Sequence, residues 1–395
     1  MKKAPLVYFA VAFLYLINTS IVSGQITTET QKPPNIVLIM ADDMGFSDIG
    51  CYGGEINTPN IDSIAAKGIR FTQFYKTARC WTTRASNLSG YYAQQVNIGY
   101  PARAAFPQWG HLIPHHLKQA GYRSYHSGKW HVNNVKMKLA DGGFDRSFDC
   151  THSEDHHLEL KPEYLILDDK RFSEIDREID GDYYSTSVIT DFSIEFLEEH
   201  FKDFKNSPFF LYVAYLAPHF PLQAPQEDID KYRERYLSGW EVLKEERYKR
   251  QLEMGFEPGR NSPFEYYVSS PYSWPEEMIT DTIPGEIHLS RPWNQLTEKE
   301  KYLQATKMAV RAAMVEGIDR EVGRLMKYIE SVGEDQNTLF LFLSDNGADA
   351  TVLVRGNGHD SKAPLGSEDS YLCLGPGFSS ASNTPFRRHK VWVHE

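Results

Sequence analysis

The sequence predicts an α/β fold, a sandwich in which helices cover a central β-sheet. Short apolar segments of strand type alternate along the chain with segments of helical periodicity. Polar residues directly follow several strand segments, as in open α/β sheets that carry a site at the carboxyl ends of their strands. The 395 residues are 41% hydrophobic, enough for one large core or for a core with a smaller subdomain.

The predicted strands are short runs of apolar residues bounded by polar or turn-forming ones. The first, residues 35–40, reads Asn-Ile-Val-Leu-Ile-Met and ends abruptly at Ala-Asp-Asp. A buried strand that delivers two carboxylates at its carboxyl end is the natural interpretation. Further strands are predicted at residues 122–126, 208–215 and 338–343.

The predicted helices rest on capping residues, prolines and terminating glycines. Thr58 precedes Pro59 at one helix start, and Gly68 ends that helix. Further helices are predicted at residues 82–88, 112–119, 184–200 and 301–331. Residues 226–300 are charged, aromatic and rich in proline without clean periodicity. We interpret them as an insertion of loops and short helices over one face.

The charge of the chain argues against nucleic acid or anionic lipid as a partner. Lys and Arg number 42 against 53 Asp and Glu, which gives a formal charge of -11. Partners of that kind need a broad electropositive surface. An anionic substrate must therefore be met by local positive charge.

The amino-terminal segment has the layout of a secretory signal peptide. Lys2 and Lys3 precede an apolar run that ends at small residues, so we predict a signal peptide over residues 1–24 and a linker over residues 25–34. An uncleaved membrane anchor is the alternative, although the run is short for a bilayer span. We expect an exported protein, periplasmic or extracellular, with no stable membrane span.

Two predicted strands far apart in sequence end in oxygen-bearing side chains. Asp42 and Asp43 follow the first strand, and Asp345 and Asn346 follow the last. Three carboxylates and an amide oxygen form a hard ligand set suited to Ca²⁺ or Mg²⁺. Helix caps and turns are the alternative interpretation for such residues.

The four cysteines are too few for a disulfide framework, and their spacing matches no zinc motif. They are Cys51, Cys80, Cys150 and Cys373. Cys80 lies just before a predicted helix start, where backbone N–H groups and the helix dipole favour an anion. A buried structural cysteine is the alternative.

Several basic side chains also follow strand segments. Lys129 and His131 share one loop and can face one pocket if that loop is extended. His219 follows another strand between two prolines. Structural, hydrogen-bonded histidines are the alternative. A further cluster lies in a polar stretch that we interpret as a solvated loop; it comprises His152, Glu154, Asp155, His156 and His157.

Together these segments resemble the sulfatase family, and its bacterial arylsulfatase-like branch in particular. The matching blocks follow the family order over nearly all of the mature chain. They are residues 35–43, 58–62, 78–90, 121–122, 128–131, 217–219, 344–347 and 383–395. The resemblance implies an alkaline-phosphatase-like sandwich of a mixed central sheet between helices. It also implies a catalytic domain over residues 35–395 that is incomplete at its carboxyl end, with the carboxyl-terminal subdomain missing.

The resemblance implies a divalent metal ion, Ca²⁺ ahead of Mg²⁺, on Asp42, Asp43, Asp345 and Asn346. An oxygen of the residue made from Cys80 would complete the ligand set. That residue is formylglycine, which a formylglycine-generating enzyme produces during maturation. Hydrated formylglycine would offer one hydroxyl to attack sulfur and a second through which sulfate is expelled.

The resemblance also assigns roles to five basic residues. Arg84 would orient the nucleophile, and Lys129 and Lys390 would hold sulfate oxygens. His131 and His219 would be the acid–base pair, with His219 protonating the departing oxygen and His131 assisting release. These residue types suit the reaction, because a sulfate ester requires charge neutralisation on three oxygens and protonation of its leaving group.

One departure from the family pattern keeps an alternative open. The maturation motif is normally Cys-x-Pro-x-Arg, whereas Thr82 stands at the proline position here. We expect weakened conversion of Cys80, and a non-catalytic glycan-binding relative with unconverted Cys80 is one alternative. A phosphodiester or phosphonate monoester hydrolase on the same scaffold is the other. Aryl sulfates and sulfated glycans both remain open as substrates.

Overall fold

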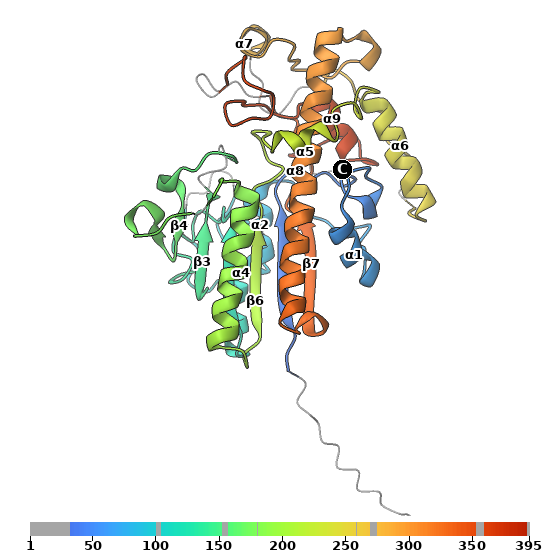
Figure 1. Ribbon diagram of the computed structural model, residues 1–395. Helices are drawn as coiled ribbons and strands as arrows, with labels where there is room; N and C mark the ends of the chain where they lie inside the picture. The colour runs from blue at the N-terminus through green and yellow to red at the C-terminus, as the bar shows by residue number, and fades with distance from the viewer. Residues whose placement is uncertain are drawn as a thin grey trace, which may run out of the picture. The chain divides into compact units, whose positions relative to one another are not determined.

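A mixed sheet forms the centre of the structure, a computed structural model, with the strand order β5-β4-β3-β2-β6-β1-β7 (Figure 1). Strands β3, β2, β6, β1 and β7 run parallel, whereas β4 and β5 are antiparallel to their neighbours. The strands are β1 Asn35–Ala41, β2 Arg123–Gly128, β3 Arg146–Asp149, β4 Ile166–Leu167, β5 Lys170–Arg171, β6 Phe209–Ala214 and β7 Thr338–Ser344.

The structure describes residues 32–99, 104–151, 157–179, 181–257, 259–268, 275–352 and 359–392. The predicted signal peptide lies outside these ranges, as do His152, Glu154, Asp155 and His156 of the predicted solvated loop. Within the described ranges, no helix has the length and apolar character that a bilayer crossing needs.

Helices pack on both faces of the sheet. The described helices are α1 Pro59–Lys67, α2 Cys80–Ser89, α3 Ile113–Gln119, α4 Ser185–Asp203, α5 Gln226–Asp230, α6 Trp240–Glu253, α7 Glu276–Thr282, α8 Glu298–Ser331 and α9 Pro376–Ser382. Of these, α4 and α8 lie on one face and α2 on the other. Figure 1 shows α4 and α8 in front of the strands. The predicted α/β sandwich with a mixed sheet is therefore confirmed.

Alternation along β1 explains how the two layers of helices are held. Val37 and Ile39 belong to the core that includes α4 and α8, whereas Leu38 and Met40 belong to the core that includes α2. Because successive side chains of a strand point to opposite faces, a single apolar run serves both cores. Strand β6 is buried at every position for the same reason.

Strand β7 differs from the other long strands. Its neighbour among the described strands is β1 alone, and two of its side chains, Leu339 and Leu341, are 49% and 40% exposed. The alternate residues Phe340 and Phe342 pack against the core instead. β7 is thus an edge strand with one covered face, and it leads directly to Asp345.

Helix α8 is the longest described helix and begins with a capping box. The side chain of Thr297 accepts a hydrogen bond from the backbone N–H of Glu300, whose own side chain accepts from Thr297. The predicted helix began at residue 301, a few residues late. Strands β3 to β5 and helix α9 were not predicted, because they are too short to show a period.

Candidate active site

Four parallel strands, β1, β2, β6 and β7, have their carboxyl ends on the same side of the sheet. Hydrogen bonds continue there beyond the strands themselves: the backbone N–H of Asp345 donates to the Ala41 carbonyl at 3.1 Å. Likewise the N–H of Lys129 donates to the Ala214 carbonyl at 2.7 Å. The loops that follow β1, β2, β6 and β7 are therefore held side by side, as expected for parallel strands.

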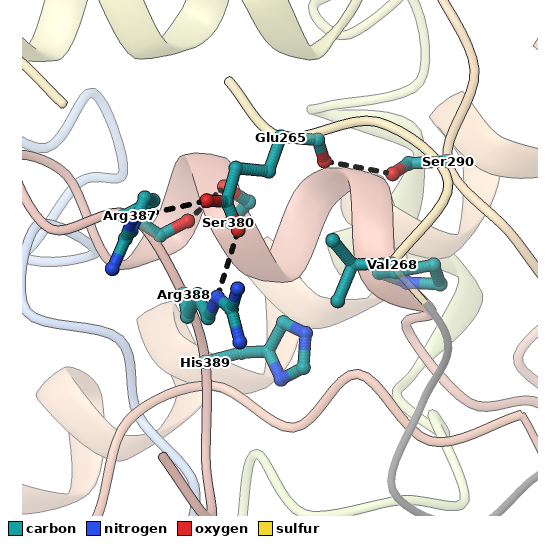
Figure 2. A pocket seen from close by; sticks show the side chains of 8 residues that line it. Glu265, Val268, Ser290, Ser380, Arg387, Arg388 and His389 are labelled. Atoms are coloured by element: carbon teal, nitrogen blue, oxygen red, sulfur yellow. Dashed lines mark hydrogen bonds and ion pairs between the residues drawn. The ribbon is translucent and has the colours of Figure 1, made fainter. Parts of the chain in front are cut away.

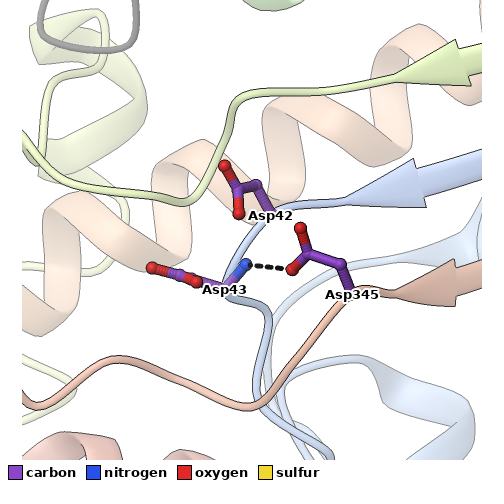
Figure 3. A group of neighbouring side chains, drawn as sticks. All are labelled: Asp42, Asp43 and Asp345. Atoms are coloured by element: carbon purple, nitrogen blue, oxygen red, sulfur yellow. Dashed lines mark hydrogen bonds between the residues drawn. The ribbon is translucent and has the colours of Figure 1, made fainter. Parts of the chain in front are cut away.

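Three carboxylates from two of these loops form a buried cluster, shown in Figure 3. Oxygens of Asp42, Asp43 and Asp345 all lie within 4.8 Å of one another, and all three residues are at most 1% exposed. The backbone N–H of Asp43 donates to Oδ1 of Asp345 at 3.3 Å. Asp43 adopts a left-handed backbone conformation, with φ 64°, and its Oδ1 accepts a hydrogen bond from the amide nitrogen of Asn346.

Each carboxylate of the cluster faces a cation, and two of these cations, Lys129 and Arg84, are completely buried. Lys129 Nζ lies 2.5 Å from Asp42 Oδ2, and Arg84 Nη2 lies 2.7 Å from Asp345 Oδ2. Lys390 Nζ lies 2.8 Å from Asp43 Oδ1 and 3.0 Å from Oδ2. The structure therefore brings three predicted basic residues and three predicted ligands into one site.

The electrostatics of the cluster differ between its members. Burial opposes ionisation of Asp42, but Lys129, His219 and Arg84 hold its pKa well below the ordinary value. Burial and the neighbouring Asp42 raise the pKa of Asp345 to about 6, and Arg84 does not fully offset them. Burial disfavours the charged form of Asp345, and repulsion by the neighbouring carboxylate adds to that effect. Additional positive charge at this point would favour the ionised carboxylate.

Two oxygens of the site suit such a positive charge. Oδ1 of Asp42 and Oδ1 of Asn346 are buried and have no hydrogen-bond partner within the part of the chain that the structure describes. The amide nitrogen of Asn346 donates to Asp43 instead. Buried acceptors are rarely left unsatisfied, and oxygens of this type are the ligands that Ca²⁺ takes. The side chains present thus fit a hard divalent cation.

A fourth carboxylate was missed by the sequence analysis. Oδ2 of Asp349 lies 3.2 Å from Lys390 Nζ, and the backbone N–H of Lys390 donates to the Ala348 carbonyl at 3.0 Å. Although burial opposes it, Asp43 and Asp349 raise the pKa of Lys390 well above its ordinary value. Asp349 follows β7 in the same loop as Asp345, and this position could have identified it as a candidate site residue from the sequence.

Lys76 was also missed. It precedes α2 in a loop without regular structure, and its ammonium interacts electrostatically with Asp345 and Asp43. No motif or periodicity marks this position in the sequence.

Cys80 is the first residue of α2 and is only 3% exposed. Burial raises the pKa of its thiol to about 12, although Lys390 and Lys129 favour the thiolate. An unmodified Cys80 is therefore protonated at neutral pH and is a poor nucleophile. One turn later, Arg84 Nη1 donates to the Lys129 carbonyl and to the Tyr212 hydroxyl, both at 3.1 Å.

The two predicted acid–base histidines lie in different surroundings. His219 Nε2 lies 3.7 Å from Asp43 Oδ2, and its Nδ1 lies 2.6 Å from the Phe220 carbonyl. The ring of His131 lies 5.7 Å from that of Trp81, which directly follows Cys80. Thus His219 is at the carboxylate cluster, and His131 is beside the segment that carries Cys80.

The interpretation of His157 as part of a solvated loop is wrong. His157 is completely buried; its Nδ1 lies 3.0 Å from the Ser185 hydroxyl and its Nε2 lies 3.1 Å from the His219 carbonyl. Polar neighbours in sequence suggested exposure, but its partners lie 28 and 62 residues away. His157 therefore supports the loop of His219.

A small cavity lies near the segment that leads to Lys390 (Figure 2). Its volume of about 10 Å³ holds one water molecule at most. The carboxylate of Glu265 is paired there with Arg387 at 3.1 Å and with Arg388 at 2.7 Å. This contact ties the segment before Lys390 to residues 259–268, and the cavity is too small for a substrate.

Known proteins resemble this chain over most of its length. A family model described as Sulfatase matches residues 34–390. An uncharacterized sulfatase of Schizosaccharomyces pombe is 31% identical over 400 residues, covering 92% of this chain and 68% of its own. An arylsulfatase of Klebsiella aerogenes is 28% identical over 398 residues, covering 93% and 80%.

Solved structures share the fold. One, in complex with its substrate D-glucosamine-2-N,6-O-disulfate, has a TM-score of 0.54 at 23% identity and covers 80% of this chain. Another, in complex with a neocarrahexaose, has a TM-score of 0.51 at 23% identity and also covers 80%. This chain spans 66% and 59% of their respective lengths.

Proposed function

The chain belongs to the sulfatase family, and we propose that it hydrolyses sulfate esters with a nucleophile made from Cys80. The observation that carries the proposal is the buried site at the ends of β1 and β7. There, carboxylates of both strands meet three cations and the amino-terminal end of α2. A sulfate ester carries negative charge on three oxygens. This site brings together the cationic hydrogen-bond donors that would stabilise that charge.

We propose that a divalent ion, Ca²⁺ ahead of Mg²⁺, binds Asp42, Asp43, Asp345 and Asn346. Four carboxylates, counting Asp349, face three cations in direct contact and a further electrostatic interaction from Lys76, so little net positive charge is left for an anionic substrate. The oxygens of Asp42 and Asn346 that lack hydrogen-bond partners among the described residues support this assignment. When bound, the ion would supply charge stabilisation for sulfate oxygens.

The basic residues of this chain would bind the sulfate group, transfer protons and position the nucleophile. Lys129 and Lys390 already point their ammonium groups at the cluster, where they would hold sulfate oxygens. His219 would donate a proton to the ester oxygen as the sulfur–oxygen bond breaks. His131 would take a proton during sulfate release. Arg84, through its ion pair with Asp345, would hold α2 and its first residue, Cys80, next to the carboxylates.

Oxidation of Cys80 to formylglycine is the second part of the proposal. The raised pKa of the Cys80 thiol supports it, because the unmodified residue is not a thiolate at neutral pH. Formylglycine, when hydrated, would supply the attacking hydroxyl. Both Cys80 and Arg84 are buried, so a formylglycine-generating enzyme would have to read them before the chain folds.

A non-catalytic glycan-binding protein is the second candidate function, and Thr82 is the observation that favours it. Thr82 stands where the family motif has proline. The fold accommodates it: its hydroxyl donates to the Arg79 carbonyl at 3.1 Å and accepts from the Thr77 hydroxyl at 2.7 Å. Thr82 is therefore compatible with the fold, and only chemical analysis of Cys80 can decide whether the residue is converted.

The test is to express the chain with a formylglycine-generating enzyme and to analyse the peptide containing Cys80 by mass spectrometry. We expect a partly converted aldehyde, and turnover of 4-nitrophenyl sulfate that exceeds turnover of 4-nitrophenyl phosphate. Cys80→Ala should abolish turnover, whereas Cys51→Ala, at another buried free cysteine, should keep it. An unmodified Cys80 with no turnover would favour the glycan-binding candidate, and faster phosphate turnover would favour a phosphoryl hydrolase.

A further inference from the structure

Arg311 of helix α8 is a buried arginine that contacts the loops after β1 and β6. It is 1% exposed. Its Nη2 donates to the Asp43 carbonyl at 2.6 Å, and its Nη1 donates to the Pro218 carbonyl at 3.4 Å. These carbonyls belong to two loops, one that carries a predicted metal ligand and one that carries His219.

Asp48 fixes the direction of the Arg311 side chain. Oδ2 of Asp48 accepts from Arg311 Nη2 at 2.9 Å and from Nε at 3.2 Å. Arg247 of helix α6 donates to the other oxygen, Oδ1, at 2.8 Å. The backbone N–H of Gly45 donates to Oδ2 at 2.9 Å. Despite burial, Arg311 and Arg247 lower the pKa of Asp48 to about 2. The carboxylate therefore stays charged, and the guanidinium is held on a fixed counter-ion.

The arrangement couples two parts of the site that are far apart in sequence. Pro218 directly precedes His219, whose Nε2 lies 3.7 Å from Asp43 Oδ2. Asp43 has a left-handed backbone, a conformation that costs energy in a residue other than glycine and needs support from its surroundings. A single guanidinium that binds both carbonyls can supply that support.

We propose that Arg311 is a positioning residue that sets the Asp43 carboxylate and the His219 imidazole relative to each other. The inference rests on the proposed function, in which Asp43 is a metal ligand and His219 is the acid. The planar fork of arginine is suited to this task, because its donors reach two carbonyls and a carboxylate at once. A lysine carries its three N–H donors on a single nitrogen, whereas the contacts of Arg311 are made by three separate guanidinium nitrogens.

Lys307 offers a matched control on the same helix. It lies one turn before Arg311, is completely buried, and binds Glu286 at 2.7 and 2.8 Å. Its other partner is the Gln304 side chain at 3.2 Å, so its contacts lie outside the site. A variant at Lys307 removes a buried charge from α8 without touching the loops of Asp43 and Pro218.

The experiment compares the full chain with its Arg311→Lys and Lys307→Gln variants. Each protein is treated with EDTA, dialysed and titrated with CaCl₂ by calorimetry, and its unfolding midpoint is measured separately. We expect Arg311→Lys to weaken Ca²⁺ binding about tenfold, as changes to groups that orient metal ligands do. Lys307→Gln should lower the unfolding midpoint but change Ca²⁺ affinity less than about twofold, because sites that share no partners are rarely coupled.

The outcomes separate the inference from the proposed function. If the parent chain binds no Ca²⁺, the proposed metal site is wrong and the inference falls with it. If the parent chain binds Ca²⁺ and folded Arg311→Lys binds it equally well, the inference alone is overturned, as it is if Lys307→Gln weakens binding equally. Should Arg311→Lys not fold, Asp48→Asn is the second variant, which keeps the guanidinium and removes the charge of the carboxylate that holds it. It is expected to weaken Ca²⁺ binding about threefold, and unchanged binding would also refute the inference.

Discussion

The buried histidine His157 makes the stability of this protein depend on pH in a direction that can be tested. Burial, together with the nearby His219, lowers the pKa of His157 to about 3. In the unfolded chain the same group titrates near its ordinary value of about 6.5. Below that value the unfolded state binds a proton that the folded state does not, so acid destabilises the fold.

The size of the effect follows from the two pKa values. At pH 5 the unfolded chain gains about 2 kcal/mol from protonating this one histidine, at 1.36 kcal/mol per pH unit below about 6.5. His126 is buried in the same way, with a pKa also lowered to about 3. The pair should together remove about 4 kcal/mol of unfolding free energy between pH 8 and pH 5, a large share of a normal stability.

The assay is urea unfolding, followed by circular dichroism at pH 8, 6.5 and 5. His157→Gln retains an amide that can bond the His219 carbonyl and the Ser185 hydroxyl but carries no titrating group. Its loss of stability from pH 8 to pH 5 should be smaller than that of the parent chain by about 2 kcal/mol. His116→Gln, at an exposed histidine, should leave the pH dependence unchanged. Equal pH dependence in His157→Gln and the parent chain would refute the reasoning.

Three further predictions concern the proposed chemistry. Thr82→Pro restores the family motif Cys-x-Pro-x-Arg, and the fold should accept it because proline is tolerated in a first helical turn. It should raise the converted fraction of Cys80, measured by mass spectrometry, and the 4-nitrophenyl sulfate rate in the same proportion. An unchanged converted fraction would count against the role of this motif. His219→Ala should slow alkyl sulfates about 10²-fold or more but activated aryl sulfates less, because a general acid matters most for basic leaving groups; equal losses would leave His219 only a positioning role. Asp42→Asn should strip Lys129 of its counter-ion, weaken Ca²⁺ binding in calorimetry and lower the unfolding free energy by about 3 kcal/mol; Ca²⁺ affinity equal to that of the parent chain would remove Asp42 from the ligand set.

The sequence was most informative where a single segment carried its own signal. Strands β1 and β6 could be predicted because each is a continuous apolar run buried on both faces. Strands β4 and β5 could not, since each has two residues and no period. The meeting of Asp42 and Asp345 could be expected because both follow parallel strands, but their order in the sheet had to come from the structure.

Residues whose role depends on distant partners were missed. Arg311 looks like one more charged residue of a long helix, yet its partner Asp48 lies 263 residues earlier. His157 lies among polar neighbours and is nevertheless buried against the His219 loop. Spacing along the chain cannot reveal such contacts, because they arise only when separate elements pack together.

The edge position of β7 gives the proposed ion a second consequence. β7 is held by one neighbouring strand among those described, and it ends where carboxylates of β1 and β7 repel each other. Elements held by few neighbours are the ones that open locally most readily, and an opened segment is accessible to proteases. An ion that binds only the closed arrangement favours it by mass action. The supply of that ion would then set how long the chain survives among proteases, besides whether it turns over substrate.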